Sequence, residues 1–486
     1  MSNPTAQHSA DERLLDAALA QVYGGDDAVV LAAGPAARRV PWLQAAVFLL
    51  GIGITVLVFL GGGTGDLVSA QDPVPFGVAL RAEGRAEVEA LPDDITNLTC
   101  RLLKTEDLRL LERFRSLRRL QIGALNVKIA GYEFISKHTL WPNAPAEVFA
   151  PLASLPALES LTLPMHVKLT GKHLTPLRTC ASLRELSVMG GHIPLTEEFV
   201  AALDQLPHLR SLQLDLVPCD AAVVRTLRKL GLEGLSLSRC QGFEGEAFAE
   251  LCAMSTLRRL TLHRFGTRQL GQEGKGNYWM PSAADLSQLK SLESLQHMKF
   301  QSTSIGGDEL KALPDDLLSL ELWATELLPA DYLELRRFAS LQRLRVRTAR
   351  QTFTFGSRDT IEQSESAANA IADAIATLPL LELDFTGSVT QPLMRQLGVQ
   401  PNLCKLRLSA HRIPFLDELA TAPVLHALQL FQNSWPSQLS LDQLRALTKC
   451  QALAELEVGG QFAFSKQDVV TLFGERVTVT YHVYGK

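Results

Sequence analysis

A six-residue phrase, L-x-x-L-x-L with conservative variants, returns fourteen times between residues 95 and 458 of this chain. It reads, for example, LRRLQI, LRELSV, LQRLRV and LAELEV. Ten of the thirteen intervals between the middle apolar residues are 22 to 28 residues long. A repeat of this length predicts a solenoid, because one such unit cannot bury its apolar face alone and must stack on its neighbours.

Helical sequences lie between the phrases, such as FVAALDQL, AAVVRTLRKL and LDQLRALTK. Each repeat therefore combines a short strand with a helix, and parallel stacking buries both along one core. Because a helix is wider than the spacing of about 4.8 Å between strands, the stack must bend with its strands inside. We expect an α/β horseshoe with a parallel inner sheet, outer helices and a last strand through Val477 and Val479.

These repeats resemble leucine-rich repeats with long helical units, as in ribonuclease-inhibitor-like and bacterial leucine-rich-repeat proteins with a membrane anchor. The resemblance covers about residues 91–486, or about 14–15 repeats. The family usually places Asn or Cys three residues after the last strand leucine, and here only Cys240 and Asn433 clearly do so. The resemblance implies recognition of a protein or another ligand, and no catalytic residues carry over.

An apolar run from Trp42 to Leu60 predicts a transmembrane helix, placed at residues 41–61. Arg38 and Arg39 precede it, so residues 1–40 are expected in the cytoplasm and the repeats outside it. The alternative is a signal peptide cleaved after Ala70.

Two shorter segments flank the apolar run. Within residues 1–40, apolar residues at helical spacing predict one short amphipathic helix, either resting on the membrane surface or docking a cytoplasmic partner. Residues 62–90 are rich in glycine and proline near their start and are expected to be a flexible linker.

The composition argues against several functions. A net charge of −5 lacks the basic footprint of nucleic-acid binding. No hydrolase, nucleotide-binding or metal-binding motif is found, so we expect neither an enzyme nor a cofactor. The seven cysteines are scattered and are interpreted as small core residues, with one disulfide or a metal site as the alternative. Asp220, directly after Cys219, is interpreted as a helix cap.

The middle x of L-x-L should face the concave side, because alternate strand residues face opposite ways. This position is small and neutral in the first seven phrases and mostly charged in the last seven: Thr99, Gln121, Thr162, Ser187, Gln213, Ser236, Thr261, then Lys299, Glu321, Arg345, Asp384, Arg407, Gln429 and Glu457. The charges either pair across strands or form a recognition strip. Arg343, Arg345 and Arg347 project from one repeat, and the strip hypothesis has them bind an acidic partner.

Three long intervals predict insertions after strands, at about 126–144, 266–280 and 349–361. Together with the remaining tryptophans they predict a rim of loop aromatics, which either binds a ligand or caps the core. These candidates are Tyr132, Trp141, Tyr278, Trp279, Trp323 and Trp435.

The functional prediction is a membrane-anchored recognition protein that binds a protein or a glycan. Its ligand would contact the concave face and the aromatic rim. The alternative is a scaffold component of the cell envelope that assembles laterally.

Overall fold

The computed structural model describes most of the chain after residue 79. The described residues are 80–82, 84–100, 105–122, 146–163, 169–188, 197–215, 219–238, 240, 243, 245–263, 281–301, 305–323, 327–347, 358–410, 412–432, 439–460 and 462–483. The segments predicted as the cytoplasmic helix and the membrane span lie outside these residues. None of the described helices is long and apolar enough to cross a bilayer.

One parallel sheet of sixteen strands, ordered as in the sequence, organises the repeats. The middle leucines align across neighbouring strands, as Leu320 does with Leu344 and Leu344 with Leu383. The strands are β1 (Leu80–Ala82), β2 (Asn97–Cys100), β3 (Arg119–Ile122), β4 (Ser160–Leu163), β5 (Glu185–Val188), β6 (Ser211–Asp215), β7 (Gly234–Ser238), β8 (Arg259–His263), β9 (His297–Gln301), β10 (Ser319–Trp323), β11 (Arg343–Arg347), β12 (Glu382–Thr386), β13 (Lys405–Ala410), β14 (Ala427–Gln432), β15 (Glu455–Gly460) and β16 (Thr478–Val483).

The fourteen phrases form β2 to β15, and β16 is the expected last strand. β1 was not expected, because it lies within residues 62–90, the segment interpreted as a linker. Its Leu80 pairs with Leu98 of β2, and its Ala82 is buried. With Leu-x-Ala in place of the full phrase, this strand carries too little of the pattern to be recognised. The solenoid therefore begins at least ten residues before the expected boundary.

Helices close each repeat on the side away from the sheet. The α-helices are α3 (Arg85–Glu89), α4 (Gly171–Leu174), α5 (Glu197–Ala202), α6 (Ala221–Lys229), α7 (Glu246–Cys252), α8 (Ala283–Ser287), α9 (Gly307–Ala312), α10 (Arg358–Ile375), α11 (Gln391–Gly398), α12 (Leu441–Ala446) and α13 (Lys466–Phe473). The 3₁₀ helices are η2 (Thr105–Arg113), η3 (Ala146–Ser154), η4 (Thr175–Thr179), η5 (Leu203–Gln205), η6 (Gln288–Ser291), η7 (Pro329–Arg337), η8 (Leu416–Thr421), η9 (Leu447–Lys449) and η10 (Gly474–Arg476).

Many repeats use a 3₁₀ helix where the sequence predicts an α-helix. A 3₁₀ helix rises about 2 Å per residue, so it crosses the back of a repeat with fewer residues. The longest of the described helices, α10, has 18 residues and begins at Arg358, inside the insertion predicted at 349–361. Part of that long interval is therefore helix rather than loop.

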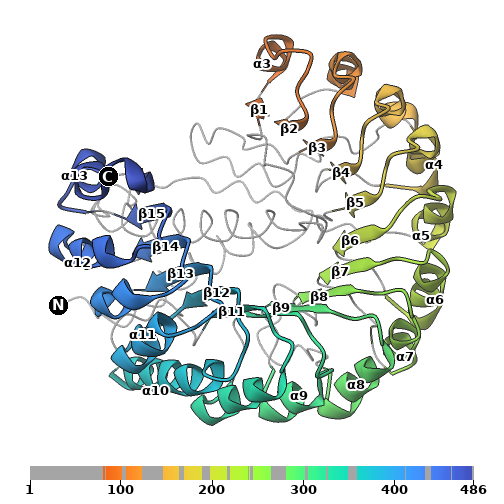
Figure 1. Ribbon diagram of the computed structural model, residues 1–486. Coiled ribbons are helices and arrows are strands. Elements are labelled where there is room, and N and C mark those ends of the chain that lie inside the picture. The colour runs from red at the N-terminus through yellow and green to blue at the C-terminus, as the bar shows by residue number, and fades with distance from the viewer. Residues whose placement is uncertain are drawn as a thin grey trace, which may run out of the picture. The chain divides into compact units, whose positions relative to one another are not determined.

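The unit that contains the sheet curves with its strands inside and its helices outside (Figure 1). Between these layers runs one apolar core, in which leucines such as Leu98, Leu212 and Leu406 are buried. This arrangement confirms the prediction that the wider helical layer lies on the convex side.

Two repeats share the sequence A-L-P-D-D, and both bind an arginine from the next repeat in the same way. Arg337 donates to the carbonyls of Leu310, Lys311 and Leu313 and pairs with Asp315. Arg113 donates to the carbonyls of Val88, Glu89 and Leu91 and pairs with Asp93 at 3.4 Å. Each guanidinium thus adds hydrogen bonds to carbonyls at the end of the preceding helix, where backbone donors are few. The shared contacts support a duplication of this unit.

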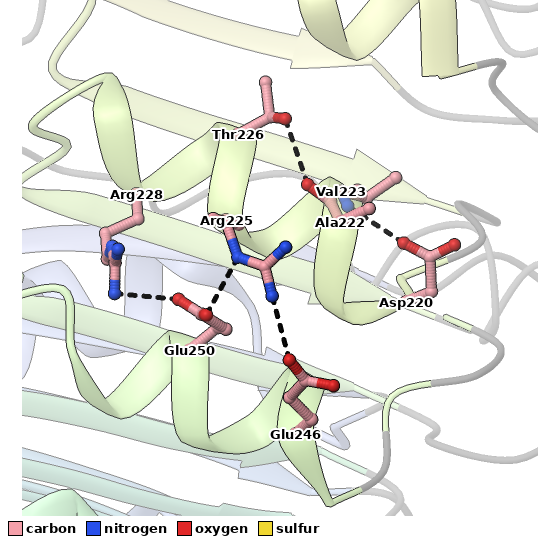
Figure 2. Close-up of polar contacts among 8 residues, drawn as sticks. All are labelled: Asp220, Ala222, Val223, Arg225, Thr226, Arg228, Glu246 and Glu250. Carbon is pink, nitrogen blue, oxygen red and sulfur yellow. Dashed lines mark hydrogen bonds and ion pairs between the residues drawn. The ribbon is translucent and has the colours of Figure 1, made fainter.

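The convex face carries ion pairs between neighbouring helices. Figure 2 shows Arg225 of α6 bridging Glu246 and Glu250 of α7 at 2.8 and 3.0 Å, with Arg228 at 2.8 Å from Glu250. Asp220 accepts a hydrogen bond from the Val223 amide at 2.9 Å, which confirms its predicted role as a helix cap.

Six of the seven cysteines are buried and only Cys404 is exposed, which agrees with their interpretation as core residues. Cys180 and Cys450 occupy equivalent helix ends. Each donates to a carbonyl of the preceding repeat, at Leu152 and Ala422.

Candidate functional site

The strand register arranges the predicted recognition residues side by side. Lys299, Glu321, Arg345, Asp384, Arg407, Gln429 and Glu457 occupy equivalent positions on successive strands from β9 to β15. We call these seven residues the concave strip. On β11 the even-numbered residues are buried and the odd-numbered ones are not. The odd-numbered positions therefore face the hollow of the curve, as the alternation of strand side chains predicts.

Cross-strand ion pairs connect the first five residues of the concave strip. Glu321 lies 3.0 Å from Lys299 and 3.5 Å from Arg345. Asp384 lies 2.8 Å from Arg345 and 3.9 Å from Arg407. The alternating charges thus neutralise one another in pairs, as the simpler of the two sequence interpretations has it.

Trp323 is the last residue of β10 and is only 8% exposed. The position predicted from the sequence, in the loop after the strand, is therefore wrong for Trp323, and its burial argues against an exposed rim at this residue. Its ring is covered by cations, with the Arg347 guanidinium 3.5 Å from the ring centroid, Lys299 at 4.8 Å and Arg345 at 5.9 Å. An indole face attracts cations, which explains why three gather on it.

The three arginines of β11 differ in their partners. Arg343 lies 3.7 Å from Glu382, and Arg345 lies between Glu321 and Asp384. Arg347 stacks on Trp323 and, within the described part of the chain, forms no ion pair with a carboxylate. The charge of Arg347 is therefore the least compensated of the three.

Burial changes the ionisation of this cluster. Burial lowers the pKa of the Arg347 guanidinium, and the nearby Asp384 carboxylate opposes that change. Burial raises the pKa of Asp384, while Arg345, Arg407 and Arg347 act in the opposite direction. Charges interact strongly in such a partly desolvated place, so an anionic group brought there would be attracted more strongly than on an open surface.

His297 lies in the row next to the concave strip, on β9. Burial, followed by the charges of Arg259 and Arg343, lowers its pKa to about 4 from the ordinary value of 6.5. His297 is therefore neutral at pH 7, and the positive charge around it comes from arginines.

The C-terminal end of the concave face has a different character. A shallow depression lies between Lys405 of β13 and Glu455 of β15, where the small Ala427 leaves space. Beside it, Glu457 accepts a hydrogen bond from Gln429 at 2.7 Å and lies 2.7 Å from the His482 ring nitrogen. Carboxylates dominate this end, whereas arginines dominate β11.

A serine, a histidine and an aspartate also stand side by side on three strands. Asp215, Ser238 and His263 share one register position, and the Ser238 hydroxyl lies 3.2 Å from His263 Nδ1. In a catalytic triad the histidine stands between the other two, whereas here the serine does. This register does not provide a triad.

The remaining predicted site residues lie outside the described part of the chain. These residues are Tyr132, Trp141, Tyr278, Trp279 and Trp435. Within the described residues, no group of three or more metal-ligating side chains could hold a metal ion.

The sequence indicated Trp323 and Arg347 as separate candidates and did not indicate that they lie in one row. Only the middle x of L-x-L was compared between repeats. The residues two positions further along each strand also form a row, which contains Gln301, Trp323, Arg347 and Thr386. Reading this second position along the array is the signal that would have paired Trp323 with Arg347.

Comparison with known proteins gives a fold likeness only. No family model matches the chain, and no curated protein matches it. The chain is similar to an internalin of Listeria monocytogenes, with 13% identity and a TM-score of 0.31 over 79% of this chain and 89% of that one. It is similar to a leucine-rich-repeat protein of Leptospira interrogans, with 15% identity and a TM-score of 0.30 over 81% and 97%.

The class of protein rests on the chain's own repeats. Fourteen L-x-x-L-x-L phrases form successive strands of one parallel sheet, with a helix closing the repeats behind it. This is a leucine-rich-repeat solenoid, an architecture that presents a long concave surface.

Proposed function

We propose that this chain is a membrane-anchored recognition protein whose concave face binds an acidic group of a macromolecular partner at Arg347. The observation that carries the proposal is the stacking of Arg347 on the Trp323 ring, while no carboxylate of the described residues forms an ion pair with it. Arg343 and Arg345 are already paired, so a ligand would have to displace Glu382, Glu321 or Asp384 to reach them.

The stacked guanidinium is prepared for an anion. Contact with the indole holds the long side chain in place, so less conformational entropy is lost when a ligand binds. A guanidinium can also donate two parallel hydrogen bonds to one carboxylate while its face remains on an aromatic ring. The acidic group would belong to a protein or a glycan, and the predicted loop aromatics would extend the contact.

The membrane anchor is the second part of the proposal. The run from Trp42 to Leu60 would cross the bilayer, with residues 1–40 in the cytoplasm and the repeats outside it. Arg38 and Arg39 on one side of the run support this orientation.

Binding can be tested on the full-length chain in detergent with a fluorescent oligoglutamate peptide as the probe. We expect Arg347→Gln to weaken binding about tenfold, which corresponds to about 1.4 kcal/mol. Arg225→Gln, on the convex face, is the matched control and should leave the affinity unchanged. Equal affinities for wild type and Arg347→Gln would overturn the assignment of Arg347.

Orientation can be tested through Cys404, the one exposed cysteine of the chain. A membrane-impermeant maleimide should label it in spheroplasts if the repeats lie outside the cytoplasm. Cys404→Ser should abolish this labelling. Labelling that requires lysis would contradict the proposed orientation.

Lateral assembly is a second candidate, favoured by exposed apolar side chains near the start of three neighbouring strands. Leu381, Val399 and Val424 precede β12, β13 and β14 and are 37%, 60% and 37% exposed. Light scattering of the purified chain separates the candidates: a concentration-dependent increase in mass, abolished by Val399→Ser, would favour assembly.

A further inference from the structure

The indole nitrogen of Trp323 is a buried donor that the described residues leave unsatisfied. Trp323 is only 8% exposed, and within the described part of the chain its Nε1 atom has no hydrogen-bond partner. An indole N–H can only donate, and a buried donor without an acceptor lowers stability. Arg347 stacks on the same ring. An unused donor therefore lies beside a guanidinium with which no described carboxylate forms an ion pair.

The cations around this ring come from both neighbouring strands. Lys299 Nζ on β9 and the guanidinium carbons of Arg345 and Arg347 on β11 all lie within 5.9 Å of the ring centroid. Together with the N–H of Trp323, donors from three strands gather around one ring. A carboxylate has two oxygens in one plane, whereas a phosphate monoester has three acceptor oxygens that point in different directions. The arrangement of the donors therefore fits a phosphate monoester better than a carboxylate.

The charges of this surface do not cancel. On β9 to β13, the concave strip and the row of Trp323 contain two carboxylates, Glu321 and Asp384, and four cations, so their net charge is +2. The cations are Lys299, Arg345, Arg347 and Arg407. A carboxylate would neutralise one positive charge, whereas a phosphate monoester carries about 1.5 to 2 negative charges at pH 7. The excess charge therefore also matches a phosphate monoester.

The far end of the concave face indicates what kind of molecule carries the phosphate. Glu455 on β15 is exposed and, among the described residues, forms no ion pair. A partner that reaches both ends of the face therefore needs basic groups as well as the phosphate. A protein segment can carry both, whereas a phosphorylated sugar carries only the anion. β11 and β15 are four strand spacings apart, about 19 Å, which an extended peptide spans with about six residues.

We propose that the acidic group bound at Arg347 is a phosphate monoester on a protein partner, and that basic residues of the same segment pair with Glu455. This inference rests on the function proposed above and names its ligand. Arg347 donates two parallel hydrogen bonds to the phosphate. Lys299 has three donors, so it can bind a phosphate oxygen while it remains 3.0 Å from Glu321. Because Nε1 of Trp323 is covered in this structure, the side chains over the ring shift as the phosphate enters.

The test compares three fluorescent peptides by anisotropy on the full-length chain in detergent. They carry phosphoserine, glutamate or serine at one position and two lysines about six residues further on. We expect the phosphoserine peptide to bind about tenfold more tightly than the glutamate peptide, and the serine peptide to bind least tightly. Equal affinities for the phosphoserine and glutamate peptides would overturn the assignment to phosphate.

Two further measurements test the assignment to a protein. Replacing the two lysines of the phosphoserine peptide by alanine should weaken binding about threefold, and Glu455→Gln should abolish this difference. Unlabelled glucose 6-phosphate should compete weakly. If it displaces the labelled peptide as effectively as the unlabelled phosphoserine peptide does, the partner is not recognised as a protein segment.

Variants of the site isolate the contribution of each donor. Trp323→Phe keeps an aromatic ring and removes only the N–H, so it should weaken the phosphoserine peptide about threefold and the glutamate peptide less. If Trp323→Phe fails to fold, Lys299→Gln provides the same comparison with the same expected selective loss. Arg225→Gln on the convex face is the matched control and should leave all affinities unchanged.

The outcomes separate this inference from the proposed function. If Arg347→Gln leaves the binding of both anionic peptides unchanged, the function proposed above fails, and the inference with it. If Arg347→Gln weakens both peptides and the wild type binds them equally, the function stands and only the assignment to phosphate fails.

Discussion

The two halves of the solenoid share one core but present different concave surfaces. In the N-terminal half, β2 to β8, the middle x of L-x-L is a threonine, serine or glutamine, and Thr99 contacts Gln121 at 3.5 Å. In the C-terminal half, β9 to β15, the same position holds the concave strip with its ion pairs. Core residues such as Leu212 and Leu406 are equally buried in both halves.

At the residue directly before each strand, the distribution of ion pairs between the two halves is reversed. In the N-terminal half, Arg118 pairs with Glu159 at 3.7 Å and Arg210 with Glu233 at 3.8 Å. The equivalent positions before β12, β13 and β14 carry Leu381, Cys404 and His426. Register and core constrain the backbone, while residues facing solvent vary between repeats, so each half can carry a different surface on the same scaffold.

The largest effect should come from the shared core. Leu212→Ala and Leu406→Ala each remove a fully buried side chain and should each destabilise the fold by about 3 kcal/mol. Urea unfolding followed by circular dichroism measures both. A much smaller effect at one site would break the assumption that the halves have equivalent cores.

A loss of folding stability at acidic pH should come from His297, in the C-terminal half. The folded-state pKa of His297 is lowered to about 4, so its contribution to stability is complete above the ordinary pKa of 6.5. That contribution is lost as the pH falls from 6.5 to 4, because protonation then favours the unfolded state. After a reduction for partial exposure, the loss is about 2 kcal/mol.

The control for this prediction is His297→Gln, which cannot be protonated. Urea unfolding of both chains between pH 7 and 4 should show a smaller pH dependence in the variant. Parallel curves for the two chains would contradict the lowered pKa.

Removing one carboxylate from the concave strip should increase the difference between the two halves in binding of an anionic probe. Asp384→Asn leaves Arg345 and Arg407 without their shared partner. We expect affinity for the oligoglutamate probe to rise about threefold, since the local charge becomes more positive, and to return toward the wild-type value at high salt. Ser187→Ala in the N-terminal half is the matched change and should leave affinity as it is. Fluorescence anisotropy measures both.

The smallest effect should come from the convex face. Arg225→Gln removes the pairs to Glu246 and Glu250 shown in Figure 2. These exposed pairs are screened by water, so thermal unfolding should be close to that of the wild type. A large loss of stability would show that the convex layer does more than close the repeats.

Much of the fold could be predicted because its pattern is local and repeated. The phrase identifies strands β2 to β15, and strand alternation identifies which residues face the hollow. The helix cap at Asp220 follows from residue type alone. β1 escaped notice because its short strand lacks the phrase. Trp323 was misplaced because the end of a strand depends on pairing with β9, which no local pattern encodes.

The candidate site was predicted less completely. Sequence indicated a charged strip around Arg345 and left open whether its charges pair with one another or bind a ligand. The structure shows Arg345 paired on both sides and Arg347 on the indole.

By itself, the sequence determined the repeat, the parallel sheet and the chemistry of each face, because these depend on residues near one another in the chain. Only the tertiary structure decided which arginine of β11 stacks on the Trp323 ring and which ones pair with carboxylates of the described strands. Those outcomes depend on distances across neighbouring repeats. Shifts of one or two ångströms separate an ion pair from a free charge, and no periodicity in the sequence records them.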